Sequence, residues 1–108
     1  MANAFTAVRA WRFGGSNGKS LIAVEGTLVI DTTASGGAVA DDLLASLFGL
    51  QKIIGPAIIS NDGEDKIYFG APDYTGDSLL VGGGAAGATQ DLPNDTYKVY
   101  IVGFGQSN

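Results

Sequence analysis

The chain begins with an alternation of residue types that is typical of a β-strand. Residues 5–13 read Phe-Thr-Ala-Val-Arg-Ala-Trp-Arg-Phe, a two-residue period in which successive side chains point to opposite faces. One face then carries Phe5, Ala7, Arg9, Trp11 and Phe13. Segment 14–18 is rich in Gly and contains an Asn-Gly pair, which favours a tight hairpin turn. We therefore expect the first strand to pair with the segment that follows.

That segment, residues 21–32, also alternates. One face is apolar and carries Ile22, Val24, Leu28 and Ile30. Gly26 interrupts the pattern midway, and a glycine inside a long strand usually marks a bulge or a bend. The sequence therefore predicts a long strand with an irregularity near its centre.

A helical spacing follows in the middle of the chain. Apolar residues recur there at intervals of three and four: Val39, Leu43, Leu44, Leu47, Phe48 and Leu50. Asp41 and Asp42 lie where carboxylates favour a helix start, and Gly49 lies where a C-terminal cap belongs. Two to three turns are unstable alone in water, so we expect this short helix to plug one end of a sheet.

The rest of the chain predicts four more strands. Residues 52–60 are apolar on both faces and contain Pro56, which indicates a buried strand beside an edge or bulge. Further strands are expected within residues 65–70, 78–82 and 96–104. The whole chain, residues 1–108, is thus interpreted as one all-β domain: an antiparallel β-sandwich or small barrel of about six strands with one short helix at one end.

The last strand is apolar on both faces, and charged residues make up only 16% of the chain, against about 25% in typical domains. This combination implies either deep burial or contact with another subunit. Tyr97, Val99 and Ile101 are assigned to the core. The candidate interface with another subunit or a partner protein consists of Phe5, Trp11, Phe13, Tyr100 and Phe104.

Composition excludes several classes of function. The net charge is −5 and the six basic residues are scattered, so nucleic acid is not an expected partner. The chain has no His and no Cys, which removes disulfides, thiol nucleophiles, imidazole bases and zinc fingers. It also contains no apolar run near the ~20 residues of a membrane span and no signal-peptide pattern. We expect no cofactor, no membrane partner and assembly in the cytoplasm.

Two glycine-rich segments imitate nucleotide-binding motifs. Residues 82–87 satisfy GxGxxG, but Pro93 follows without a helical pattern between them, and the motif needs a helix N-terminus for the pyrophosphate. Residues 14–20 resemble a phosphate loop but lack its glycine spacing and lead into a strand. A hairpin turn and a Gly/Ala loop are the preferred interpretations.

The eleven carboxylates are the remaining candidates for chemistry. Residues 61–65 (Asn-Asp-Gly-Glu-Asp) could offer oxygen ligands to calcium, but they lack the EF-hand ligand order and are interpreted as a solvated turn. Asp73 and Asp77 flank another loop, which is likewise interpreted as a solvated turn. A hydrolase that uses a pair of carboxylates stays open as a minor alternative, while the main prediction is that the chain is not an enzyme and binds no metal.

Three segments carry a family resemblance: residues 24–32, residues 45–50 and residues 97–103. They resemble short virion structural proteins of tailed bacteriophages. The resemblance implies a small β-rich protein that coats or cements a phage head or sits on a tail. Taken with the sparse charge and the apolar faces of the two terminal strands, it leads us to expect a non-enzymatic protein that decorates or stabilises the capsid as a homo-oligomer, with a trimer favoured. Its partners would be copies of itself and a capsid protein, and its location would be the virion, assembled in the host cytoplasm.

A carbohydrate-binding β-sandwich, such as a tail or surface adhesin, is the alternative interpretation. In that case Trp11 or Tyr74 would stack on a sugar ring, and Asp62 or Asp73 would bind its hydroxyl groups.

Overall fold

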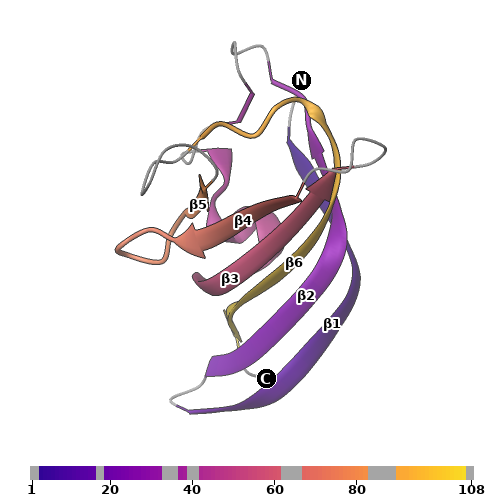
Figure 1. The fold of residues 1–108 in the computed structure, drawn as a ribbon. Helices are drawn as coiled ribbons and strands as arrows, with labels where there is room; N and C mark the ends of the chain where they lie inside the picture. The colour runs from indigo at the N-terminus through magenta and orange to yellow at the C-terminus, as the bar shows by residue number, and fades with distance from the viewer. Residues whose placement is uncertain are drawn as a thin grey trace.

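The protein contains one antiparallel sheet. The computed structural model describes residues 3–16, 19–32, 37–38, 42–61, 67–82 and 90–106. The strands are β1 (Ala4–Ser16), β2 (Lys19–Ile30), β3 (Lys52–Asn61), β4 (Ile67–Pro72), β5 (Leu79–Gly82) and β6 (Asp95–Gln106). They lie in the order β1-β2-β6-β3-β4-β5, and each neighbouring pair is antiparallel (Figure 1). The predicted all-β class with six strands is confirmed.

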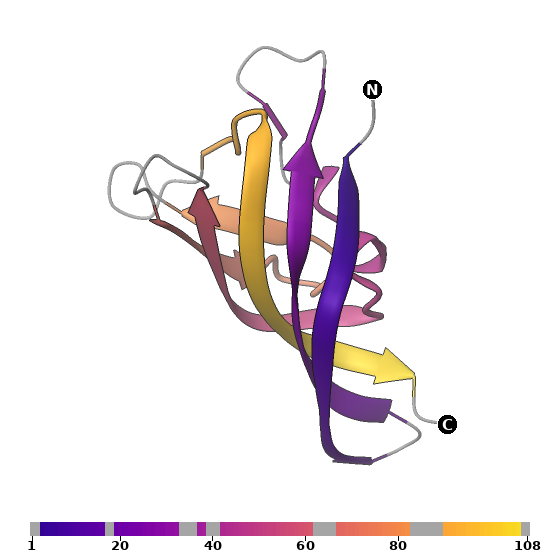
Figure 2. The same cartoon turned by 90° about the vertical axis from the view of Figure 1, so that its right-hand side faces the viewer.

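The sheet bends strongly over its own inner face. β1, β2 and β6 run along the length of the molecule, whereas β4 runs across them (Figure 2). The sheet is nevertheless open, because β1 and β5 are its two ends and have no paired neighbour on their far sides in the described ranges. The predicted closure into a sandwich or barrel is therefore not confirmed.

The core lies on the inner face of this bend. The predicted apolar face of β2 is buried, and so is the face of β6 that was assigned to the core: Ile22, Val24, Leu28, Ile30, Tyr97, Val99 and Ile101. β3 adds Ile53, Ala57 and Ile59 from the neighbouring position. The two-residue period thus identifies most of the inner face correctly, since each pleat places alternate side chains on the same side.

The predicted helix of two to three turns is wrong in length. Among the described residues from Leu43 onward, the segment forms a 3₁₀ turn, η2 (Ala45–Phe48), which ends at Gly49 with φ 75° as the sequence indicates. The backbone of Leu43 and Ala45 instead forms hydrogen bonds at and just before β5. Ala45 N–H donates to Asp77 O at 2.8 Å, and Leu43 O accepts from Leu79 N–H at 2.8 Å. These bonds hold the chain extended, so the i to i−4 bonds of an α-helix cannot form there.

η2 packs against the inner side of the sheet through Phe48. Phe48 is 3% exposed, and its ring meets that of Phe5 edge-on with centroids 5.2 Å apart. Of the predicted helix start, Asp42 is exposed and Asp41 lies outside the described residues.

β3 shows the predicted irregularity beside Pro56. Its register with β6 shifts between Ile53 and Ala57. The expectation of burial on both faces is wrong, however, because Ile54 is 39% exposed and Ile58 is 44% exposed. Burial in the core therefore does not explain why β3 carries apolar side chains on its outward side.

Candidate interaction surface

At a bulge in β1, the odd-numbered side chains change from the inner face of the sheet to the outer face. Phe5 pairs with Leu28 and Ala7 pairs with Gly26, but the next pair joins Arg9 to Glu25, so Val8 is an extra residue. The period therefore shifts by one, and the prediction that all five alternate residues share one face is wrong. Phe5 and Ala7 lie on the inner side, whereas Arg9 and the aromatic residues after it lie on the outer side.

The outer side of the sheet carries a set of large apolar residues, here called the outer patch. Its members are Trp11, Phe13, Ile58, Phe69, Tyr100 and Phe104. Tyr100, Ile58 and Phe69 are cross-strand neighbours on β6, β3 and β4. Phe13 and Phe104 both pair with Leu21, which lies between them on β2. The members of the patch therefore come from four strands, β1, β6, β3 and β4.

Most of the patch is accessible to solvent. The exposed fractions are 43% for Trp11, 53% for Phe13, 44% for Ile58, 62% for Phe69 and 42% for Tyr100. Phe104 is half-buried. Side chains of this size and type are usually buried in a small domain, so their collection on one face is the main feature of this surface.

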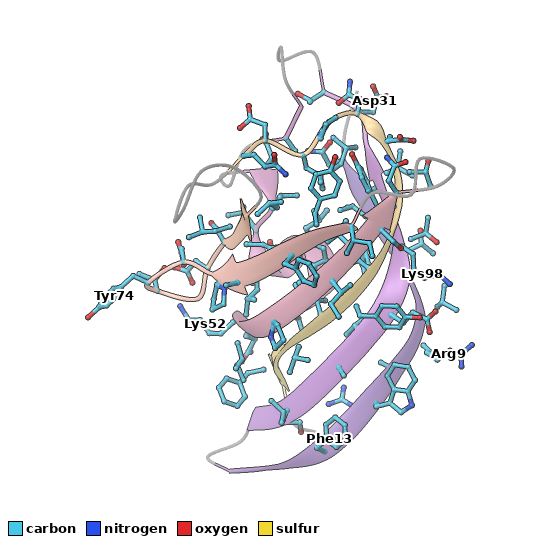
Figure 3. All side chains as sticks on the ribbon, viewed as in Figure 1. Arg9, Phe13, Asp31, Lys52, Tyr74 and Lys98 are labelled. Atoms are coloured by element: carbon cyan, nitrogen blue, oxygen red, sulfur yellow. The ribbon has the colours of Figure 1, made fainter. Side chains whose placement is uncertain are left out.

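A polar group at one end of the patch orients its aromatic residues. Arg9 Nε lies 3.0 Å from Glu25 Oε1, and the Tyr100 hydroxyl donates to Glu25 Oε2 at 3.3 Å. The Arg9 guanidinium also lies 6.0 Å from the centroid of the Trp11 ring, within range of a cation–π interaction. Figure 3 shows Arg9 and Lys98 projecting from one side of the molecule and Tyr74 from the opposite side.

The structure brings together four of the five candidate interface residues. Trp11, Phe13, Tyr100 and Phe104 lie in the outer patch, whereas Phe5 packs on the inner side against Phe48. Phe5 is misplaced because the uninterrupted period ignores the bulge at Val8.

Sequence reasoning missed Ile58 and Phe69. The signal for Ile58 is the two-sided apolar run of residues 52–60, which by itself predicts burial on both faces. The signal for Phe69 was the apolar run Ile67-Tyr68-Phe69. Tyr68 is buried there, while Ile67 and Phe69 point outward with more than half of each side chain exposed.

The carboxylates after β4 support their own loop. Asp73 Oδ1 accepts from the Thr75 hydroxyl at 3.0 Å and from Asp77 N–H at 3.1 Å. Desolvation by itself raises the pKa of Asp73, but the hydrogen bonds from Thr75 and from the backbone hold it below its usual value. The pKa of Asp77 is lowered mainly by a hydrogen bond from Lys52. These hydrogen bonds fix the turn between β4 and β5.

A hollow of about 360 Å³ lies beside this loop and is lined in part by Lys52, Ile54, Asp73 and Phe104. Tyr74 stands at its rim and is fully exposed. Trp11, the other aromatic residue proposed to stack on sugar, belongs to the outer patch and contributes nothing to this lining.

The calcium hypothesis for residues 61–65 rests on positions outside the described residues, except for Asn61. Asn61 Nδ2 donates to Asp95 Oδ2 at 2.6 Å, which ties the end of β3 to the start of β6. Asp62 of the carbohydrate hypothesis also lies outside the described residues. Among the residues that the structure does place, no group of three His, Cys, Asp or Glu could hold a metal ion.

The two nucleotide-like motifs are only partly placed. Gly15 pairs with Ser20 and Ser16 pairs with Lys19, so the described residues of segment 14–20 are the ends of two antiparallel strands and not the start of a helix. Residues 83–87 of the GxGxxG match lie outside the described residues. Within the described ranges, no helix is long and apolar enough to cross a membrane.

Comparisons with known proteins find no matching family model, no matching curated protein and no matching solved structure.

Proposed function

We propose that the protein is a non-enzymatic structural component of a phage virion, which decorates or stabilises the capsid as a homo-oligomer through the outer patch. The observation that carries this proposal is the patch itself, because it collects exposed aromatic residues from strands far apart in the chain. The resemblance to small virion proteins suggests the virion as the assembly in which this surface makes its contacts.

The size of the patch supports an interface. A large side chain has about 150–250 Å² of surface, so the exposed fractions of Trp11, Phe13, Ile58, Phe69 and Tyr100 leave on the order of 500 Å² uncovered. This area is near the upper end of the largest apolar patch on a typical monomer, about 300–600 Å². It is also enough for the centre of a standard interface, which buries about 800 Å² on each partner.

A capsid offers many identical sites in a symmetric arrangement, and a closed oligomer of this chain can occupy several of them together. Each additional contact then becomes intramolecular, so weak individual contacts give strong overall binding. The chain is acidic and sparse in charge, so apolar contact is the main attraction that it can offer to such a partner.

The test compares two exposed aromatic residues on different surfaces. Phe69→Lys changes the outer patch, and the control Tyr74→Lys changes the loop tip after β4. We expect wild-type protein and Tyr74→Lys to sediment with purified phage capsids that lack this protein, and Phe69→Lys to remain in the supernatant. Equal sedimentation of both variants would contradict the role of the patch.

Two further measurements address the virion assignment. Mass spectrometry of purified virions should detect the chain at many copies per particle, and its absence from virions would overturn the proposal. Light scattering after size exclusion should show an oligomer of the isolated protein, whose monomer mass is 11.0 kDa.

One observation favours a carbohydrate-binding function as the second candidate. Tyr74 is fully exposed beside Asp73 and the hollow next to it, an arrangement in which a sugar ring could stack while hydroxyl groups meet polar atoms. A glycan array tests this function: wild-type protein should bind at least one glycan, and Tyr74→Ala should lose that signal. No binding by the wild type would exclude it.

A further inference from the structure

β1 is a long strand that pairs with β2 along one side and has no strand paired with its other side among the residues that the structure describes. It forms one end of the sheet, has 13 residues and contains no proline. Every described side chain from Thr6 to Phe13 is exposed. Strands at a sheet edge are usually short, covered or interrupted by proline, because their free N–H and C=O groups invite another strand. The opposite edge, β5, has only four residues.

The regular part of this edge is short and well defined. The register between β1 and β2 shifts between Ala7 and Arg9 and again between Phe13 and Gly15. Arg9–Phe13 is therefore an uninterrupted five-residue stretch, in which odd positions face outward with the outer patch and even positions face inward. A partner strand can pair regularly with this stretch alone, since bulges disrupt the ladder on either side.

We propose that two copies of the chain pair through β1, antiparallel, about a two-fold axis at Trp11. Arg9 of each copy then lies opposite Phe13 of the other copy, Ala10 lies opposite Arg12, and the two Trp11 residues lie opposite each other. This inference rests on the proposed homo-oligomer and assigns its contact to the sheet edge.

The composition of Arg9–Phe13 suits pairing with itself. In the proposed register each cation lies opposite an aromatic ring or an alanine, and no two like charges face each other. Cross-strand aromatic pairs and cation–π contacts are favourable, and the small Ala10 leaves room for the Arg12 side chain. Six strands from each copy would join into one sheet, with both outer patches on the same side and able to meet a common partner surface.

The symmetry of a contact made by one edge also favours a pair over the trimer expected from the sequence. A two-fold pair uses the same edge twice and closes on itself. A ring of three built through sheet edges would have to join β1 of one copy to β5 of the next, and β5 offers only four residues.

Cysteine cross-linking tests the register, because the natural chain contains no Cys. Trp11→Cys places the two thiols opposite each other, within the Cα separation of about 7 Å that a disulfide can bridge. Phe13→Cys is the matched control on the same strand and face. Its two copies would lie four residues apart along the strands, about 14 Å at a rise of about 3.4 Å per residue.

We expect wild-type protein to scatter light as a dimer. Under mild oxidation, Trp11→Cys should run mainly as a disulfide-linked dimer on a non-reducing gel, and Phe13→Cys should run mainly as a monomer. A wild-type monomer, a trimer or equal cross-linking of the two variants would overturn the inference. If the edge proposal fails in this way while the wild type still binds capsids through the outer patch, the proposed function stands without it.

Discussion

Gly26 shows how a single residue sets the position of a neighbouring strand. A Cβ atom at this position would lie 2.4 Å from Phe5 Cζ and 2.5 Å from the Thr6 carbonyl oxygen. The absence of a side chain lets the Phe5 ring lie across β2 and reach Phe48. The Val8 bulge follows directly on the neighbouring strand, so the close approach and the exchange of faces occur at the same place.

Gly26→Ala is therefore expected to destabilise the fold. The new methyl group forces Phe5 or the β1 backbone to move, and overpacking of this kind costs about 1–3 kcal/mol. Urea unfolding monitored by tryptophan fluorescence measures the change. Gly82→Ala is the control, because its nearest heavy atom would lie at an ordinary 3.6 Å. Equal stability of the two variants would show that Phe5 does not need this space.

At the scale of elements, the strands could be predicted and the helix could not. Strand alternation is local, and burial of Ile22, Val24 and Leu28 follows from it directly. The helical spacing of residues 39–50 is equally local, but the backbone of Leu43 and Ala45 binds to residues near β5. The conformation of this segment therefore depends on partners more than thirty residues away in the chain, and the local spacing of apolar residues contains no information about them.

The same reasoning applies to the candidate surface. The two-sided apolar character of β6 leaves deep burial and contact with another subunit both open, and Tyr100 and Phe104, the candidates for such a contact, both belong to the outer patch. Phe69 comes beside them only through the order of the sheet, in which β3 pairs with both β4 and β6. That order depends on contacts between distant segments, so the full extent of the patch could not be predicted from spacing.

Phe48→Ala tests whether η2 anchors the inner face. Removal of a buried phenylalanine from a packed site costs about 3–5 kcal/mol, a large part of the about 5–15 kcal/mol that stabilises a typical domain. We expect a fall in the thermal midpoint of well over ten degrees, since 1 kcal/mol corresponds to about 4–8 °C in a domain of this size. Ser46→Ala, an exposed change in the same turn, should leave the midpoint nearly unchanged. An unchanged midpoint for Phe48→Ala would contradict the packing described above.

At the scale of the whole molecule, stability should respond to acid but not to neutral pH. The chain has no His and no Cys, so no side chain has an ordinary pKa between pH 6 and 8. Asp73 and Asp77 have lowered pKa values in the folded state. They therefore contribute stability above their unfolded pKa, near 3.8, and this contribution is lost as the pH falls through the folded pKa.

Thermal melts from pH 2 to 9 check this expectation. The midpoint should be flat from pH 6 to 8 and should fall below about pH 4. Asp73→Asn should reduce the acid-dependent fall, because its loop no longer depends on an ionised carboxylate. Melts with added calcium and with a chelator belong to the same series. A transition near neutral pH would indicate a strongly perturbed carboxylate, and a midpoint raised by calcium would revive the metal hypothesis for residues 61–65.

The place of β6 in the sheet has a consequence for how the protein is made. β6 follows all other strands in chain order, yet it lies between β2 and β3 and pairs with both. A nascent chain that has not yet exposed residues 95–106 holds a hairpin and a three-stranded unit without a strand to join them. Pairing over such sequence separation is slow, so apolar strand edges stay uncovered until β6 has been synthesised. Ribosome-bound chains that end before residue 95 should therefore be the form most prone to aggregate.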